Sequence, residues 1–196
     1  AVSAGWVASS EKFWEPISKY INHFKIRGSY GLVGSDAFAS GAPHFLYQNN
    51  IGIGSAHKFW TGLPTSEISK QGPGFYVLAV QDAGWEHVKK FDIGFDMMLF
   101  NQLNITFDYF HDKRERILMS RASWPSMLGY WGSKPWSNIG EVENQGFELS
   151  LNWTKQFGKD LTLDLRGNFT YNQNEYKYVD EPSYPYVWQT NTGKPL

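Results

Sequence analysis

The sequence predicts an all-β protein whose antiparallel strands each have one apolar and one polar face. The clearest case is residues 147–153, where apolar and polar side chains alternate strictly: Phe147, Leu149, Leu151 and Trp153 against Glu148, Ser150 and Asn152. Side chains of a strand point alternately to its two faces, so a period of two indicates a strand. Residues 161–171 repeat the pattern, and some links between such segments are very short and polar.

The N-terminal part begins with a strand and ends in a long irregular region. Alternation over residues 2–8 predicts the first strand, and a short helical connection is expected from there to about Asn22. Alternation resumes over residues 24–32. Residues 34–84 are rich in Gly, Ser and Pro and are expected to form one long loop, a length that usually accompanies a function.

The middle of the chain predicts a tight hairpin. Apolar residues alternate through residues 91–99 and again through residues 103–109, with Asn101 and Gln102 as the link. After Tyr109 the positions on the apolar face change character and become His111, Lys113 and Glu115. The apolar band therefore stops there.

Two further strands and two irregular stretches complete the chain. One strand is expected within residues 138–153, and a turn at residues 157–160 leads to another at residues 161–171. Residues 120–140 and 176–196 are aromatic and irregular and are expected to be loops. The total is roughly six strands, joined alternately by short and long connections.

The composition excludes several classes of protein. The net charge is −1 and there is no basic tract, so nucleic acid is not an expected partner. No run approaches the roughly 18 apolar residues of a membrane helix. The absence of cysteine removes disulfides and thiolate chemistry. Residues 1–14 lack the basic start and apolar core of a signal peptide.

The apolar face of each strand needs a partner, which is either a second sheet or lipid. Membrane barrels have short turns at one end and long loops at the other, and a tilted strand crosses the hydrocarbon layer in about 9 to 11 residues. The apolar bands here have that length, and Tyr109, Trp153 and Tyr171 stand at their ends, where aromatic girdles lie. These features favour an antiparallel transmembrane β-barrel segment over a soluble sandwich, whose loops follow no such rule.

Four segments carry a resemblance to one family of proteins. They are AVSAGWVASSEKFW (1–14), FKIRGSYGLVGSDA (24–37), KKFDIGFDMMLFNQLNITFDYFHDKRERIL (89–118) and NIGEVENQGFELSLNW (138–153). In this order, and with the late GKP at residues 193–195, they resemble the later part of the barrel in SusC/RagA-like TonB-dependent transporters. The resemblance covers essentially the whole chain.

The resemblance implies a function as well as a fold. Such transporters are barrels of about 22 strands with an N-terminal plug, in the outer membrane of Gram-negative bacteria. They import large nutrients, such as oligosaccharides or peptides, with energy from the TonB complex and a SusD/RagB-like surface lipoprotein as a lid. Residues 1–196 are then expected to be part of one barrel domain that lacks the plug, the N-terminal region that meets TonB, and the closing strands. Membrane lipid and lipopolysaccharide are further expected partners.

Candidate binding residues are aromatic side chains of the expected loops. Four of them can stack on sugar rings or peptide side chains, or instead pack the loops together and contact the lid: Trp124, Tyr130, Trp131 and Trp136. On the polar strand faces, Glu148, Asp164 and Arg166 are expected to line the lumen. Gly146 is expected to let a neighbouring side chain lie across its strand.

Enzymatic and metal chemistry are not expected. Carboxylates such as Asp92 and Asp96 alternate with apolar residues, as on a wet strand face, and the five histidines lack ligand spacing. No cofactor is predicted either. The alternative function is that of a soluble all-β carbohydrate-binding module. The environment of the leucines in residues 161–165 distinguishes the barrel from the soluble module. These leucines contact lipid in a barrel and are buried under a second sheet in a sandwich.

Overall fold

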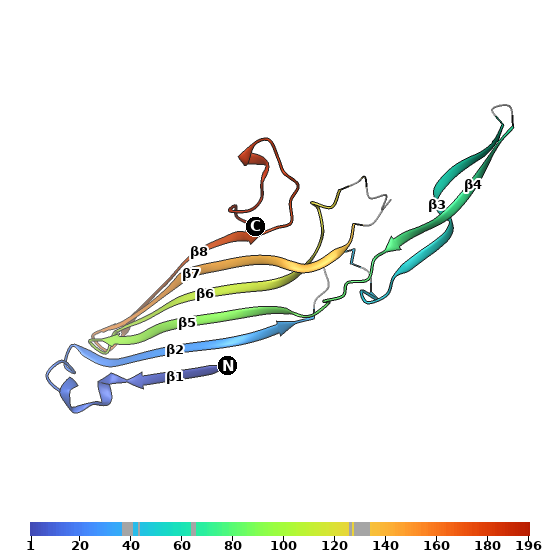
Figure 1. Cartoon of the computed structure of the whole chain (residues 1–196). Helices are drawn as coiled ribbons and strands as arrows, with labels where there is room; N and C mark the ends of the chain where they lie inside the picture. Colours follow the sequence, from blue (N-terminus) through green and yellow to red (C-terminus); the bar gives the residue numbers. More distant parts are fainter. Residues whose placement is uncertain (37–40, 43, 64–65, 126, 128–133) are drawn as a thin grey trace.

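The computed structural model describes residues 1–36, 41–42, 44–63, 66–125, 127 and 134–196. Six strands form one sheet in the order β1-β2-β5-β6-β7-β8, and every neighbouring pair is antiparallel. These strands are β1 (Val2–Val7), β2 (Ile21–Ser35), β5 (Glu86–Leu99), β6 (Leu103–Ser120), β7 (Trp136–Phe157) and β8 (Leu161–Tyr178). The described part of the chain is thus an up-and-down meander that leaves β1 and β8 as open edges (Figure 1).

Short and long connections lie at opposite ends of this sheet, as the sequence predicted. Residues 100–102 and 158–160 are tight turns, and residues 8–20 at the same end hold two 3-10 turns, η1 (Ala8–Ser10) and η2 (Lys12–Trp14) (Figure 1). In the first turn, Phe100 and Asn101 both have positive φ, 54° and 55°, which suits the right-handed twist of the flanking strands. The other end has the long connections and the C-terminal segment with η4 (Val187–Gln189).

The expectation that residues 34–84 form one loop is wrong. They contain a two-stranded hairpin, β3 (Asn50–Leu63) and β4 (Ser66–Val77), which projects beyond the end of the main sheet (Figure 1). Both strands are edges, and an edge strand tolerates glycine and proline that would break a central one. Pro73 pairs with Ile53 next to a shift in register. Because the shift interrupts the period of two, the sequence shows no strand pattern here.

One face of the main sheet carries a row of neighbouring aromatic rings that runs across five strands. Neighbouring ring centroids are 6.0 Å apart for Phe24 and Phe95, 5.5 Å for Phe95 and Phe107, 6.0 Å for Phe107 and Phe147, and 5.7 Å for Phe147 and Phe169. Such distances lie within the range of favourable aromatic pairs. Each pair stabilises the fold by about 0.5–1.5 kcal/mol beyond the effect of burying apolar area. The row ties the strands together on their apolar face.

The described residues place no second layer on this apolar face. On β8, Leu163 remains 40% exposed, Leu165 54% and Phe169 56%. In a sandwich such side chains are buried against the facing sheet. The single-layer arrangement therefore contradicts the soluble sandwich and agrees with the predicted barrel segment.

No helix in the described part of the chain is long and apolar enough to cross a membrane.

A small hydrophobic core lies instead at the end with the long connections. It consists of Leu46, Val80 and Leu118, with Ala42 and Trp136 packed against it. Next to it, the side chain of Asn138 accepts a hydrogen bond from Gly84 N–H (3.2 Å) and donates to the carbonyl oxygens of Gly84 (2.9 Å) and Arg116 (3.0 Å). These contacts hold Gly84, in the link between β4 and β5, against β6 and β7.

Candidate functional site

The polar face of the main sheet is the candidate functional surface. The strand register places Glu148 opposite Asp108, Arg166 opposite Asn152, and Asp164 opposite Thr154, all on the side away from the aromatic row. The predicted residues Glu148, Asp164 and Arg166 thus share one face, and Arg27 on β2 joins them. The two faces of the sheet therefore differ sharply in chemistry.

Arg27 is the centre of an ion-pair cluster on this face. Its guanidinium nitrogens lie 2.6 Å from Asp108, 3.4 Å from Asp96 and 3.9 Å from Asp92. To meet Asp108 on β6 the side chain crosses β5 at Gly94. A Cβ there would lie 2.1 Å from Asp108 Oδ1 and 2.5 Å from the Phe107 carbonyl oxygen, so only glycine leaves the room.

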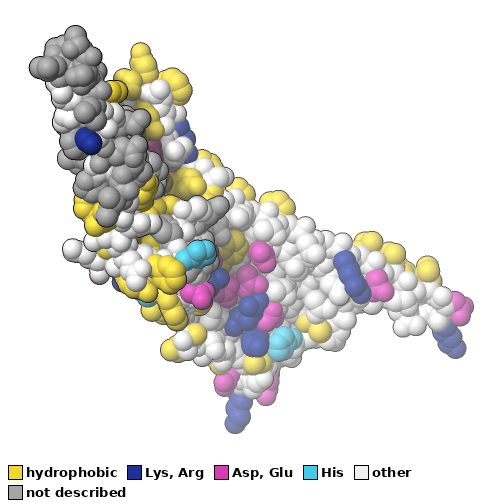
Figure 2. Space-filling model, turned by 90° about the vertical axis from the view of Figure 1, so that its right-hand side faces the viewer, with side chains coloured by type: hydrophobic (Ala, Val, Ile, Leu, Met, Phe, Trp, Pro, Cys, Tyr) yellow, Lys and Arg dark blue, Asp and Glu magenta, His cyan; other side chains and the backbone are white. Residues whose placement is uncertain are grey.

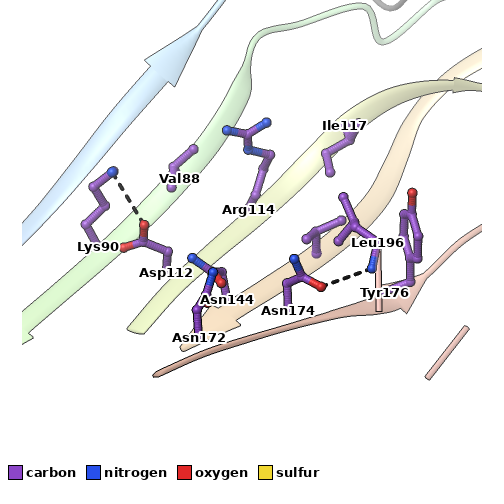
Figure 3. A pocket seen from close by; sticks show the side chains of 11 residues that line it. Val88, Lys90, Asp112, Arg114, Ile117, Asn144, Asn172, Asn174, Tyr176 and Leu196 are labelled. Carbon is purple, nitrogen blue, oxygen red and sulfur yellow. Dashed lines mark hydrogen bonds and ion pairs between the residues drawn. The ribbon is translucent and has the colours of Figure 1, made fainter. Parts of the chain in front are cut away.

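A hollow of about 430 Å³ adjoins this cluster toward the long connections. Its walls come from four neighbouring strands and from the last residue of the chain (Figure 3): Val88, Lys90, Asp112, Arg114, Ile117, Val142, Asn144, Asn172, Asn174, Tyr176 and Leu196. Lys90 Nζ lies 3.4 Å from Asp112, and Leu196 N–H donates to Asn174 Oδ1 at 3.0 Å. On the β6–β8 side, carboxamide and charged side chains therefore stand beside apolar ones such as Ile117 and Val142.

Phe110 is an aromatic side chain of the same polar face and lines a second hollow, of about 390 Å³. It pairs with Gly146 across β6 and β7, and a Cβ on Gly146 would lie only 2.7 Å from Phe110 Cζ. The same Cβ would meet the Tyr171 carbonyl oxygen at 2.2 Å. The expectation that Gly146 makes room for a neighbouring side chain is confirmed.

Of the four loop aromatics, the structure describes two. Trp136 begins β7 and packs against the core at the rim, so its surroundings are those of a structural residue. Trp124 lies half-buried in the β6–β7 connection, where its main-chain N–H donates to the Arg121 carbonyl at 3.2 Å. Tyr130 and Trp131 lie outside the described residues.

Asp180 is a rim residue that the sequence did not single out. Its carboxylate is only 5% exposed and accepts hydrogen bonds from Ser123 Oγ (2.8 Å), Ser123 N–H (3.1 Å) and Arg121 Nε (3.2 Å). Burial opposes ionisation, but these donors outweigh it and hold the pKa of Asp180 below its usual range. The β6–β7 connection is thereby tied to the segment that follows β8.

On the face that carries the aromatic row, cross-strand rows of charged side chains lie between the apolar band and the long connections. Lys89 lies 2.6 Å from Glu115, and Lys113 lies 2.7 Å from the same carboxylate. Farther along the row, Lys177 Nζ lies 2.9 Å from Glu143. Figure 2 views the molecule from the end with the long connections, and acidic, basic and histidine side chains gather in the middle of this view. The predicted end of the apolar band after Tyr109 is confirmed, although the strands themselves continue.

Comparison with known proteins identifies related chains. Residues 8–196 match the family model described as "TonB dependent receptor-like, beta-barrel". TonB-dependent receptor P3 of Formosa agariphila is 30% identical over 171 residues, which cover 87% of this chain and 16% of the relative. TonB-dependent receptor SusC of Bacteroides thetaiotaomicron is 25% identical over 187 residues, which cover 89% of this chain and 17% of the relative.

A solved structure of the RagAB peptide importer in the "open-open" state has the same fold over this stretch. It superposes with a TM-score of 0.65 and 20% identity, covering 91% of this chain and 18% of its own. The chain spans about a sixth of the length of these three proteins, between 16% and 18%.

Proposed function

This chain belongs to the TonB dependent receptor-like β-barrel family, and from that premise we propose that it forms part of the wall of an outer-membrane transporter that actively imports large nutrients. One observation carries the proposal: a single-layer sheet with an apolar band across one face and charged and amide side chains on the opposite face. Such a sheet needs lipid on one side and water on the other. A transmembrane barrel supplies both.

The dimensions of the apolar band support the membrane assignment. On β8 the outward positions from Leu161 to Tyr171 span 11 residues and carry no charged side chain. At about 3.3 Å per residue and a tilt of about 45°, that length crosses about 25 Å, the height of the lipid-facing band of such barrels. The ion-paired rows beyond Tyr109 then stand at the level of the lipopolysaccharide head groups.

The rest of the assembly is inferred from the family. Residues 1–196 are part of one barrel domain, and the plug and the closing strands belong to other parts of a longer protein. A SusD/RagB-like surface lipoprotein covers the end with the long connections. The TonB complex acts through the N-terminal region of the longer chain. The substrate is an oligosaccharide or a peptide.

Individual residues receive roles in this transporter. Glu148, Asp164 and Arg166 line the lumen. Trp124, with Tyr130 and Trp131, contacts substrate or lid at the outer rim, whereas the packing of Trp136 against the small hydrophobic core favours a structural role.

The proposal is tested by uptake in cells that carry the full-length gene. Import of the nutrient on which the gene is needed should stop when TonB is deleted, and should fall when the partner lipoprotein is deleted. The full-length protein should fractionate with the outer membrane. A soluble protein that binds nutrient without TonB would contradict the proposal.

A further inference from the structure

The connection between β1 and β2 is longer than the other links at its end of the described sheet. It spans residues 8–20, whereas residues 100–102 and 158–160 are tight turns (Figure 1). Ser18 N–H donates to the Trp14 carbonyl at 3.0 Å, a hydrogen bond of helical spacing that makes the connection compact. Neighbouring antiparallel strands can be joined by a turn of about two residues, so the additional length is available for another role.

The connection packs on the apolar face of the sheet. The Trp14 ring is stacked on Phe24, with the ring centroids 5.3 Å apart, and Phe24 begins the aromatic row. The Phe13 ring lies 6.2 Å from that of Trp6, which pairs with Ile26 on the same face of β2 as Phe24. The connection is therefore continuous with the surface that the barrel turns toward lipid.

The apolar side chains of the connection itself remain uncovered. Phe13 is 60% exposed, Ile17 43% and Tyr20 55%. Positions four and three residues apart lie on one side of a helical turn, so these side chains form a short apolar stripe. Charged residues such as Glu15 and Lys19 stand between them in the sequence. An amphipathic segment with basic residues beside its apolar face is typical of elements that lie in the plane of a membrane interface.

The lysines of the connection differ from those at the other end of the sheet. Lys12 and Lys19 are exposed, and neither forms an ion pair with any described residue. Toward the long connections, Lys89, Lys113 and Lys177 all have carboxylate partners. Unpaired ammonium groups beside an apolar stripe are complementary to the phosphates of lipid head groups.

Lys155 indicates where the head groups lie at this end of the sheet. It pairs with Leu163 on the lipid-facing side, and its Nζ lies 5.2 Å from the centre of the Phe157 ring, two positions nearer the tight turn. A lysine on a lipid-facing surface extends its ammonium group toward the interface. The interface therefore runs along the end with the tight turns, where residues 8–20 also lie.

From these features we propose that residues 12–20 form an anchor in the inner-leaflet interface of the outer membrane and bind phospholipid there. Short turns of such barrels face the periplasm, which assigns this end of the sheet to the inner leaflet. The stripe from Phe13 to Tyr20 inserts among the upper acyl chains, and Lys12 and Lys19 contact lipid phosphates. The inference rests on the proposed transport function, because it requires the outer-membrane location.

The first test measures depth in the full-length transporter, in an otherwise cysteine-free form with a fluorescent dye on one introduced cysteine. The protein is reconstituted in vesicles of phosphatidylcholine brominated in the upper acyl chain, where bromine quenches only nearby dye. The dye on Ile17→Cys should be quenched. Glu15→Cys, on the charged side of the connection, and Lys159→Cys, in the tight β7–β8 turn, are matched controls and should stay largely unquenched.

The second test measures lipid affinity by titrating brominated phosphatidylglycerol into the same dye-labelled transporter in detergent. A lysine near an anionic surface strengthens binding about fivefold, so Lys12→Gln combined with Lys19→Gln should weaken it about ten- to thirtyfold. Phe13→Ala should weaken it about tenfold through lost apolar burial. Lys89→Gln combined with Lys177→Gln removes the same charge at the opposite end and should change the affinity less than about twofold.

Any of these results would overturn the inference: an unquenched dye at position 17, equal quenching at positions 15 and 17, quenching that requires added lipopolysaccharide, or equal losses of affinity in the two double lysine variants. Each can occur in a transporter that inserts into vesicles and supports TonB-dependent uptake. Failure of the anchor is therefore distinguishable from failure of the transport function. Heat-modifiable mobility on gels checks that every variant has assembled.

Discussion

Replacing Leu151 by arginine should block assembly of the full-length transporter, whereas the same change at the adjacent Ser150 should be tolerated. Leu151 pairs with Gly167 of β8, near the middle of the 11-residue band from Leu161 to Tyr171, and lies on the same face as the aromatic row. Ser150 points to the polar face, in register with Thr106. The two variants introduce the same side chain at the same height and differ only in the face that receives it.

The depth of the substituted residue in the bilayer sets how much stability the barrel loses. An arginine at the bilayer midplane of a barrel costs about 2–4 kcal/mol, falling to about 0–1 kcal/mol near the interfaces. Leu151→Arg should therefore lose about 2–4 kcal/mol, and Ser150→Arg about 0.5 kcal/mol or less. Leu163 pairs with Lys155 near the short turns, so Leu163→Arg should cost at most about 1 kcal/mol.

The assay is the amount of heat-modifiable protein in the outer membrane at equal expression. The expected order of assembled protein is Ser150→Arg, then Leu163→Arg, then Leu151→Arg. Equal assembly of the Leu151 and Ser150 variants, or a loss confined to Ser150→Arg, would refute the assignment of the two faces.

Two further predictions concern the ion-pair cluster and the rim. Gly94→Ala places a Cβ against Asp108 and the Phe107 carbonyl and should destabilise the barrel by about 1–3 kcal/mol in denaturant titration; a change below about 0.5 kcal/mol would show that Arg27 does not need this gap. The lowered pKa of Asp180 means that its tie to Ser123 is complete above the ordinary aspartate value of about 3.9 and is lost as the pH falls through the lower folded-state value. Amide exchange in residues 121–124 should therefore be flat from pH 7 to pH 5 after correction for intrinsic rates. Asp180→Asn should accelerate it at pH 7, and equal exchange in both proteins would contradict the role of the carboxylate.

Local alternation made the main sheet predictable. A period of two in residues 147–153 and 161–171 indicates both the strands and their facing, and the order of short and long links follows from the turn residues. Strand ends were underestimated because β6 continues to Ser120 with ion pairs such as Lys113–Glu115 in place of apolar pairs. A pattern of hydrophobicity carries no signal for such a continuation.

The polar contacts of the sheet could not be predicted because they depend on register. Arg27 and Asp108 are 81 residues apart in the chain, and Ser123 and Asp180 are 57 apart. Each pair meets only after several strands have aligned. The role of Gly94 likewise depends on a side chain from β2 that crosses β5, which no local motif encodes.

The central claim is that the two faces of this sheet meet lipid and water. The chain contains no cysteine, so single cysteines at positions 147 to 153, in an otherwise cysteine-free full-length transporter, can be labelled in intact membranes. A water-soluble maleimide should label positions 148, 150 and 152, and a lipid-soluble probe should label positions 147, 149, 151 and 153. Uniform labelling, or alternation in the opposite phase, would contradict the account.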